Sequence, residues 1–302
     1  MKFEVLIRDV KFPNPVLAAS GTFGFGLEFL TVANRLGGVV TKGLTVKPRA
    51  GNPPPRIVET PSGVVNSVGL ENPGVAMFKT DILPRLQRLK CPVLVNLAAG
   101  SLDEFCELTE ILEETPVAGL ELNLSCPNVK EGGVAFGQKP QRVAEVTRAV
   151  RKRTDKLLVV KLTANFVDPA ETAKAAEAAG ADAVSLINTL FALVLDQNGR
   201  PFLGGRTGGL SGPAIKPFAL FCVERVVKAV KIPVIGMGGI RTGQDAFEFI
   251  SAGAHLVQVG TANLTRPDGA VEVMKGLRRL ARIRGWQNWD DVRGKAGEGC
   301  FG

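Results

Sequence analysis

Eight short apolar segments recur along the 302-residue chain, and most of them are followed by an amphipathic stretch. They are rich in β-branched residues and bounded by Gly, Pro or charged residues, which is typical of buried strands. Their hydrophobicity is nearly continuous, as in parallel strands that are covered on both faces. The segments are residues 15–20, 37–43, 92–99, 119–125, 157–163, 183–189, 233–239 and 255–261.

Helical patterns lie between these segments, and the alternation predicts an α/β fold of the (β/α)8 TIM-barrel type. A doubly wound open sheet is the alternative, but no G-x-G-x-x-G fingerprint follows the first strand. Alternating residues 3–12 predict a short N-terminal hairpin at the bottom of the barrel. No domain boundary is visible, so we expect one barrel domain over residues 1–302. Examples of the helical patterns are residues 102–114, 142–153, 169–179, 217–230 and 242–252.

Three long stretches interrupt the alternation, at residues 46–73, 127–140 and 190–216. Each follows the carboxyl end of a predicted strand, which is the face where barrel enzymes build their active sites. Loops of this length are either functional or disordered. Their regular placement at one face favours a functional role, and we expect irregular loops over the C-terminal face.

Composition narrows the chemistry. Hydrophobic residues make up 45% and charged residues 22%, and no apolar run reaches the roughly 18 residues of a membrane span. The N-terminus does not have the pattern of a signal peptide, so we expect a cytoplasmic enzyme. Five widely spaced cysteines argue against a disulfide framework and against a metal or Fe–S site in this chain. His255 is the single histidine, so acid–base chemistry falls to Cys, Lys or a carboxylate.

The net charge is +8, from 37 basic and 29 acidic residues. Such a balance suits an anionic substrate, an acidic partner or RNA. The basic clusters at residues 148–156 and 275–284 have helical spacing and no interleaved aromatic residues, which indicates solvated helix faces. The charge therefore favours an anionic ligand without identifying it.

Polar residues stand at the ends of the apolar strands, although Asn and Lys are poor strand formers. Together they predict a cup lined by amide donors and acceptors and by two lysines. Such a cup suits a flat heteroaromatic ligand with an anionic group. These strand-end residues are Ser20, Gly21, Lys42, Asn96, Asn123, Ser125, Lys161, Asn188, Thr189, Gly238, Gly239, Gly260 and Thr261.

The last two predicted strands end in small residues, in Gly236–Gly239 and Val259–Thr261. Loops after strands 7 and 8 of a barrel commonly bind phosphate through backbone N–H groups and a helix N-terminus. Glycine allows the backbone to approach a phosphate closely. The implied ligand is a phosphorylated substrate or FMN.

Two residues have the chemistry of a catalytic group. Lys161 ends an apolar strand, where a lysine costs free energy unless it meets an anion. It suits either a Schiff-base nucleophile or a cation facing the N1–O2 edge of a reduced flavin, and the polar cup favours the flavin. Cys126 lies just past a strand end and can act as a base where its thiolate is favoured. Cys91, Cys106 and Cys222 are expected to be small core residues, and Cys300 to be incidental.

Three motifs carry a family resemblance. They are Asn-Leu-Ser-Cys-Pro-Asn at residues 123–128, Asn-Ser-Val-Gly-Leu-Glu-Asn at residues 66–72, and Ile-Gly-Met-Gly-Gly-Ile-Arg-Thr-Gly-Gln-Asp-Ala at residues 235–246. As an ordered set, from Ala18 to Thr261, they resemble class 1 dihydroorotate dehydrogenases. Members of that family are FMN-containing barrels in which the motif cysteine is the base, and this position is Cys126 here.

The resemblance implies a role for each matching position. Cys126 and Lys161 would be the catalytic residues. The FMN-binding residues would be Ala19, Ser20, Gly21, Lys42, Asn96, Asn123, Lys161, Ser211, Gly212, Gly238, Gly239, Gly260 and Thr261. The substrate-binding residues would be Lys42, Asn66, Gly69, Leu70, Asn123, Asn128, Asn188 and Thr189.

The implied reaction is the oxidation of (S)-dihydroorotate to orotate on the pathway to UMP. Dihydroorotate loses a proton from C5 and a hydride from C6, so a base on one face and a flavin on the other are sufficient. Cys126 would take the proton on a loop that closes over the site. Lys161 would stabilise the reduced flavin.

The segment at residues 126–137 resembles the NAD-linked branch, class 1B, more than the fumarate-linked branch. That branch pairs the barrel with a subunit bearing FAD and a [2Fe–2S] cluster. The resemblance therefore implies a homodimer within a heterotetramer, with dihydroorotate and orotate as ligands and with no nucleic-acid or membrane partner.

Other readings stay open from the sequence. A tRNA dihydrouridine synthase is also an FMN barrel with a Cys-Pro motif, but the 41 residues after Thr261 leave little room for its RNA-binding domain. A relative of dihydropyrimidine dehydrogenase would differ mainly at the substrate asparagines. A flavin-free aldolase could use Lys161 as a Schiff base. A non-catalytic scaffold would leave the polar strand ends unexplained.

Overall fold

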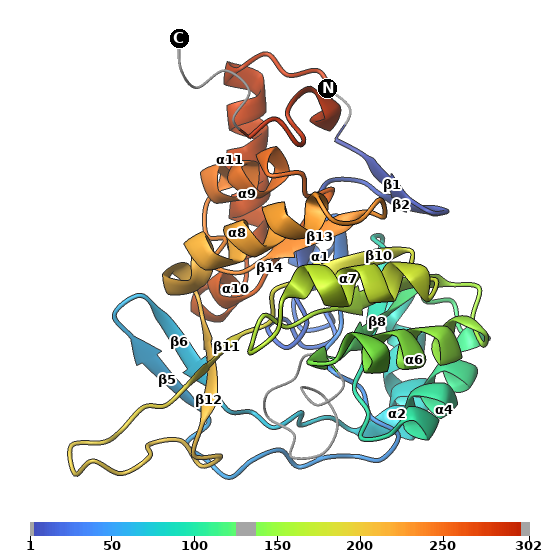
Figure 1. Ribbon diagram of the computed structural model, residues 1–302, viewed down its shortest axis with the longest axis vertical. Coiled ribbons are helices and arrows are strands. Elements are labelled where there is room, and N and C mark those ends of the chain that lie inside the picture. Colours follow the sequence, from blue (N-terminus) through green and yellow to red (C-terminus); the bar gives the residue numbers. More distant parts are fainter. Residues whose placement is uncertain (1–2, 125–136, 297–302) are drawn as a thin grey trace.

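The eight predicted strands form a closed parallel barrel in the computed structural model, which describes residues 3–124 and 137–296 (Figure 1). Neighbours in the barrel are neighbours in the chain, and the last strand closes onto the first where Val257 pairs with Val16. The TIM-barrel prediction is confirmed. The barrel strands are β3 (Val16–Ala18), β4 (Gly38–Val40), β7 (Val93–Leu97), β8 (Gly119–Asn123), β9 (Leu157–Lys161), β10 (Ala183–Leu186), β13 (Val234–Met237) and β14 (Leu256–Val259).

Burial on both faces explains why these strands are almost continuously apolar. Every residue of the eight barrel strands is buried, including the polar residues near their carboxyl ends. The outward side chains pack under the helices, and the inward ones fill the barrel in layers contributed by alternate strands. A polar side chain inside this barrel therefore has to find its partners among the other strands.

Helices surround the barrel (Figure 1), and five of them confirm the helical patterns of the sequence. Side-chain caps fix three of their starts, because Ser101 accepts from the Glu104 N–H, Asp168 accepts from the Ala170 N–H, and Thr242 forms a capping box with Asp245. The five are α4 (Leu102–Glu113), α6 (Pro140–Arg151), α7 (Pro169–Ala178), α8 (Lys216–Val227) and α9 (Gly243–Ser251). The others are α1 (Leu30–Ala33), α2 (Gly74–Met77), α3 (Leu83–Leu86), α10 (Thr261–Thr265) and α11 (Gly269–Ile283), a π-helical turn at Phe78–Ile82, and 3-10 turns at Pro213–Ile215 and Trp289–Asp291.

Within residues 3–124 and 137–296, none of the helices has the length and apolar character that crossing a membrane requires.

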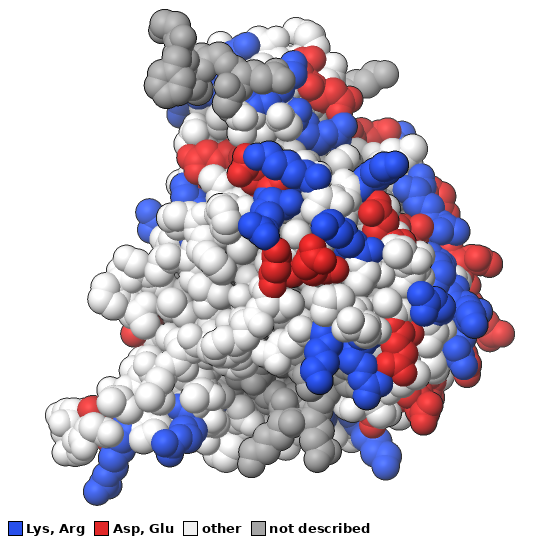
Figure 2. Space-filling view, viewed as in Figure 1, with Lys and Arg blue, Asp and Glu red and all other residues white. Residues whose placement is uncertain are grey.

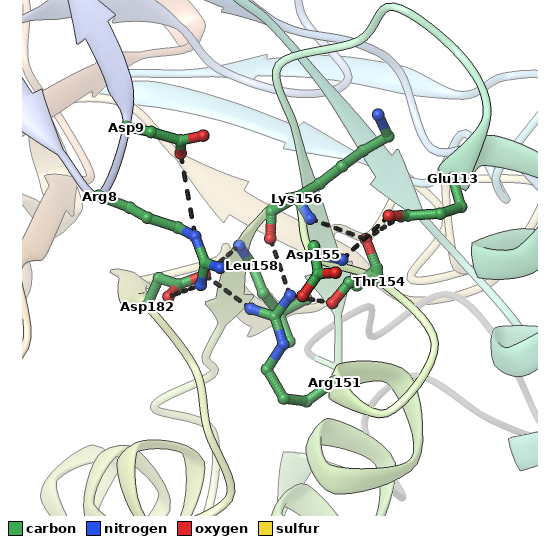
Figure 3. Close-up of polar contacts among 9 residues, drawn as sticks. All are labelled: Arg8, Asp9, Glu113, Arg151, Thr154, Asp155, Lys156, Leu158 and Asp182. Carbon is green, nitrogen blue, oxygen red and sulfur yellow. Dashed lines mark hydrogen bonds and ion pairs between the residues drawn. The ribbon is translucent and has the colours of Figure 1, made fainter.

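The predicted N-terminal hairpin is present as β1 (Val5–Ile7) and β2 (Val10–Phe12). Its Arg8 donates to Asp182, at the amino end of β10, over 2.8 Å. Arg151 donates to the other oxygen of Asp182 over 2.8 Å, and the Leu158 N–H adds a third hydrogen bond (Figure 3). The hairpin is thus tied to the amino ends of the strands, where residues of a barrel serve stability.

Long loops lie over the opposite face as expected, but two of the three stretches are not irregular throughout. Parts of residues 46–73 and 190–216 pair with one another in a four-stranded antiparallel sheet. The sequence gives no local signal for this pairing, because the partner strands β6 and β12 lie far apart in the chain. The third stretch falls mostly outside the described residues. The sheet has the order β11 (Leu190–Ala192), β12 (Gly208–Ser211), β6 (Gly63–Asn66) and β5 (Ile57–Thr60).

Candidate active site

A cavity of about 460 Å³ opens where the barrel strands reach their carboxyl ends. Its floor is formed by strand-end side chains, and part of its wall by the four-stranded sheet. Every described residue that the sequence predicted for the site lines this cavity. These residues are Ala19, Ser20, Gly21, Lys42, Asn66, Gly69, Leu70, Asn96, Asn123, Lys161, Asn188, Thr189, Ser211, Gly212, Gly238, Gly239, Gly260 and Thr261.

Three predicted residues are not part of the described structure. Cys126, Asn128 and Ser125 lie outside residues 3–124 and 137–296. The role of Cys126 as a base therefore stays a prediction, as do the cofactor and substrate roles of the lining residues.

The Lys161 side chain is buried beneath the cavity, where a charge needs compensation. Its Nζ donates to the Ser20 hydroxyl over 3.0 Å and lies 4.0 Å from the Glu121 carboxylate. β9 carries Lys161 at its last position, opposite Asn123 at the end of β8. The strand register therefore brings an ammonium group and an amide to the same end of the barrel.

Glu121 lies beneath the polar floor of the cavity and is fully buried. One carboxylate oxygen accepts from the Asn96 amide over 2.8 Å. The other accepts from the Ser185 hydroxyl over 2.9 Å and from the Gln258 amide over 2.8 Å. The Asn123 amide donates in turn to the Asn96 carbonyl over 3.2 Å.

Sequence reasoning missed Gln258 as a residue of the cavity floor, and it missed Glu121 and Ser185 as the buried residues beneath that floor. A usable signal was present in β8, because Glu121 and Asn123 are two residues apart and therefore share one face of the strand. A second signal was the presence of Gln258 two residues before Gly260 in an otherwise apolar strand. Both signals predict which face of its strand a side chain occupies, but not which residue of another strand it contacts.

Lys42 contributes a second positive charge to the cavity, and its side chain is half-buried. It forms no ion pair or hydrogen bond through its Nζ with any residue that the structure describes. A half-buried ammonium group without a carboxylate partner favours an anionic ligand.

Glycines form the rim opposite the lysines. Gly238 and Gly239 have φ values of 124° and 76°, which L side chains rarely adopt. A Cβ on Gly239 would lie 2.8 Å from the Gly212 carbonyl oxygen. The neighbouring loops are joined because the Thr261 hydroxyl donates to the Ser211 hydroxyl over 2.9 Å. This rim exposes backbone to the cavity, as a phosphate site requires.

One buried polar atom of the cavity wall has no hydrogen-bond partner among the described residues. Gln258 is 1% exposed and lines the cavity, and its Oε1 accepts no hydrogen bond from the described part of the chain. A buried acceptor without a donor is costly, so a ligand N–H is the natural partner. The lysines, the amides, the glycine rim and this acceptor fit a phosphorylated ring ligand such as FMN.

Burial shifts the pKa values of the described cysteines and of the histidine, all of which lie outside the cavity. Burial raises the pKa of Cys91 and of Cys222 to about 11. Burial, with a smaller contribution from Arg293, lowers the pKa of His255 to about 4. Cys106 is only half-buried, which corrects its expected place in the core, and burial still raises its pKa.

A closed (β/α)8 barrel with a polar, lysine-bearing cavity at the carboxyl ends of its strands defines a barrel enzyme. The dihydroorotate dehydrogenase family model matches residues 2–280. The chain therefore belongs to the dihydroorotate dehydrogenase family and is an oxidoreductase.

Individual relatives agree with this assignment. The chain is 52% identical to the catalytic subunit of dihydroorotate dehydrogenase B (NAD(+)) from Geotalea uraniireducens, over 93% of this chain and 94% of that protein. It is 50% identical to the same subunit from Desulforudis audaxviator, over 98% of both chains. A crystal structure of DHODH from Eimeria tenella in complex with ferulenol is 26% identical, with a TM-score of 0.81 over 97% of this chain and 88% of that one. The resemblance to the NAD-linked branch is thereby confirmed.

Proposed function

We propose that this chain oxidises (S)-dihydroorotate to orotate in pyrimidine biosynthesis, as the catalytic subunit of an NAD-linked dihydroorotate dehydrogenase. The observation that carries the proposal is the convergence of the family's motif residues on one cavity. Two lysines and several amides there suit a planar, anionic pyrimidine. The four alternatives have no comparable support. They are a tRNA dihydrouridine synthase, a relative of dihydropyrimidine dehydrogenase, a flavin-free aldolase and a non-catalytic scaffold.

FMN is the cofactor that this cavity suits. Gly238, Gly239, Gly260 and Thr261 would hold its phosphate through backbone N–H groups. When bound, FMN would supply an acceptor for the hydride that leaves C6 of the substrate. The residues proposed to contact the rest of the cofactor are Ala19, Ser20, Gly21, Lys42, Asn96, Asn123, Lys161, Ser211 and Gly212.

The substrate would lie against the amides on the opposite side of the cavity. Lys42 would pair with its carboxylate, and the asparagines would match the N–H and C=O groups of the ring edge. The side-chain Oδ1 of Asn188 accepts from the Thr189 N–H over 2.7 Å, which orients the Asn188 side chain. The proposed substrate residues are Lys42, Asn66, Gly69, Leu70, Asn123, Asn128, Asn188 and Thr189.

Cys126 would remove the C5 proton as its thiolate, with its Sγ as the accepting atom. Lys161 would hold its positive charge beside the cofactor and favour the negative charge that arrives with the hydride. Both roles rest on the match to the family's motif, and Cys126 lies outside the described residues.

The electrons must leave this chain, because its relatives are named as catalytic subunits of an NAD(+)-linked enzyme. Around the β5–β6 hairpin and α10 the surface is largely uncharged (Figure 2). Ile57 and Leu264 are exposed there and line the cavity mouth. An apolar surface beside the cofactor site suits the docking of an electron-transfer subunit that bears FAD and a [2Fe–2S] cluster.

A second exposed apolar cluster suits contact between two copies of the chain. It includes Phe166 and Phe191, whose rings stack at 5.6 Å, and Leu193, Leu195 and Phe202 of the segment between β11 and β12. The proposed assembly is a homodimer within a heterotetramer, located in the cytoplasm, with no nucleic acid bound.

Anaerobic mixing of the FMN-loaded protein with dihydroorotate tests the half-reaction. We expect the flavin absorbance to bleach and one orotate to form per flavin. FMN-loaded protein that does not bleach would refute the proposal.

The same measurement tests the base. The Cys126→Ala variant should keep its FMN and bleach more slowly by about a hundredfold or more, because a positioned base contributes about that factor. The Cys106→Ala variant removes a thiol from α4, away from the cavity, and should bleach at the wild-type rate. Equal rates for Cys126→Ala and wild type would remove Cys126 from this role.

A further inference from the structure

Glu121 lies inside the barrel just beneath the cavity and is fully buried. It does not line the cavity, but it contacts three residues that do. Asn96 and Gln258 donate to its carboxylate, and the Lys161 ammonium lies 4.0 Å away. Glu121 therefore reaches the site only through other side chains.

Strands on different sides of the barrel provide its hydrogen bonds. Asn96 comes from β7, Ser185 from β10 and Gln258 from β14, and all three are neutral donors. Both oxygens of this buried carboxylate therefore have hydrogen-bond partners, as a buried polar group requires.

The carboxylate also decides which way the two amides face. An ionised carboxylate only accepts hydrogen bonds, so the NH₂ groups of Asn96 and Gln258 must turn toward Glu121. Their carbonyl oxygens then face away. The Asn96 oxygen accepts from Asn123, and the Gln258 oxygen is left without a partner in the described residues.

Glu121 also offsets the charge of Lys161. The Lys161 side chain is 5% exposed, and its other partner, the Ser20 hydroxyl, is neutral. No other carboxylate within residues 3–124 and 137–296 lies within ion-pair distance of Lys161. At this depth the attraction is screened far less than at the surface.

We propose that Glu121 is a positioning residue of the oxidoreductase site, which moderates the positive charge that Lys161 presents to the cofactor and fixes the amides of Asn96 and Gln258. The inference rests on the proposed function, because the effect of Lys161 is felt by a bound flavin. Glu121 would thereby limit how strongly Lys161 stabilises the reduced form of the flavin, so that the electrons can be passed on.

The Glu121→Gln variant tests the charge. It keeps the volume of the side chain and removes its negative charge, so the charge of Lys161 is no longer offset. The flavin equilibrium should shift toward the two-electron reduced form by tenfold or more, which is a rise in midpoint potential of about 30 mV or more. Redox titration with a reference dye measures the potential without relying on turnover.

Two comparison variants separate this effect from a merely structural one. Glu121→Asp keeps the charge, so its potential should stay close to that of the wild type. Glu113→Gln removes the same group from the end of α4, where it accepts from the Asp155 N–H over 3.0 Å, and should leave the potential unchanged.

A double-mutant cycle tests whether Glu121 acts through Lys161. It also provides a second test if the single variant Glu121→Gln does not fold. Glu121→Gln combined with Lys161→Met removes both charges, and it is compared with Lys161→Met alone. The equilibrium between oxidised and reduced flavin should then differ less than twofold between the double variant and Lys161→Met. A tenfold change in this background would overturn the route through Lys161.

Flavin binding by the wild-type protein distinguishes a failure of the proposed function from a failure of the role proposed for Glu121. Wild type that binds no FMN would overturn the proposed function, and this inference with it. A flavin-loaded Glu121→Gln variant with the wild-type potential would overturn the inference alone.

Discussion

His255 shows how the environment of a single residue sets its chemistry. It is the single histidine of the chain, yet burial lowers its pKa to about 4 and keeps it neutral. It lies next to the amino end of β14, and its Nδ1 accepts from the Val234 N–H over 3.4 Å. It therefore belongs to the end of the barrel opposite the cavity and affects stability rather than catalysis.

This depressed pKa makes folding depend on pH. An unfolded chain binds a proton at His255 below about pH 6.5, whereas the folded chain does so only near pH 4. The stabilisation is present above pH 6.5 and is lost as the pH falls from there toward 4. Between about pH 7.5 and about pH 5, the free energy of unfolding should fall by about 2 kcal/mol from this residue.

Urea unfolding of the wild type and of His255→Asn at the two pH values measures this loss. The asparagine offers an acceptor to the Val234 N–H and does not titrate. The loss should be about 2 kcal/mol smaller in the variant. The same loss in both proteins would assign the pH dependence to other groups.

The identities of the strand-end residues could be read from the sequence because polar side chains interrupt apolar strands only for a reason. Gln258 of the floor, and Glu121 and Ser185 beneath it, could not be predicted in the same way. Their role depends on which strands face each other across the barrel. Neither the alternation of polar and apolar residues nor the spacing of motifs encodes which strands these are.

At the scale of elements, the barrel strands and the long helices were predictable because each carries its own periodicity. The four-stranded sheet over the cavity was not. Its central pairing joins β6 to β12, with Asn66 opposite Gly209, across a long separation in the sequence. That sheet carries Asn66 into the cavity, so this part of the site depends on long-range pairing.

Gly209 is the position where this sheet packs tightly against Thr189, a residue that lines the cavity. A Cβ there would lie 1.9 Å from the Thr189 hydroxyl, so a larger residue must displace Thr189 or the strand. Gly209→Ala should therefore weaken orotate binding by about tenfold or more, since a shift of about 1.4 kcal/mol is sufficient. FMN binding should change much less.

Titration of the FMN-loaded protein with orotate, followed by the flavin spectrum, measures this affinity. Gln197→Ala is the control, because Gln197 is exposed, does not line the cavity and lies in the same segment between β11 and β12. Equal orotate affinities in Gly209→Ala and wild type would show that the sheet does not position Thr189 for the ligand.

At the scale of the whole molecule, the two ends of the barrel have separate tasks. The amino ends are tied by Asp182 to Arg8 and Arg151, in a network that touches no cavity residue (Figure 3). The carboxyl ends carry the lysines, the amides and the glycine rim. The closed barrel was predictable from the eight repeats, whereas a single domain over residues 1–302 stays a prediction.

The placement of both ligands in one cavity is the central claim, and a crystal structure of the protein with FMN and orotate tests it most directly. We expect the FMN phosphate against Gly238, Gly239 and Gly260, with orotate between the flavin and the asparagines. Density for FMN or orotate at another place, with this cavity empty, would contradict the account.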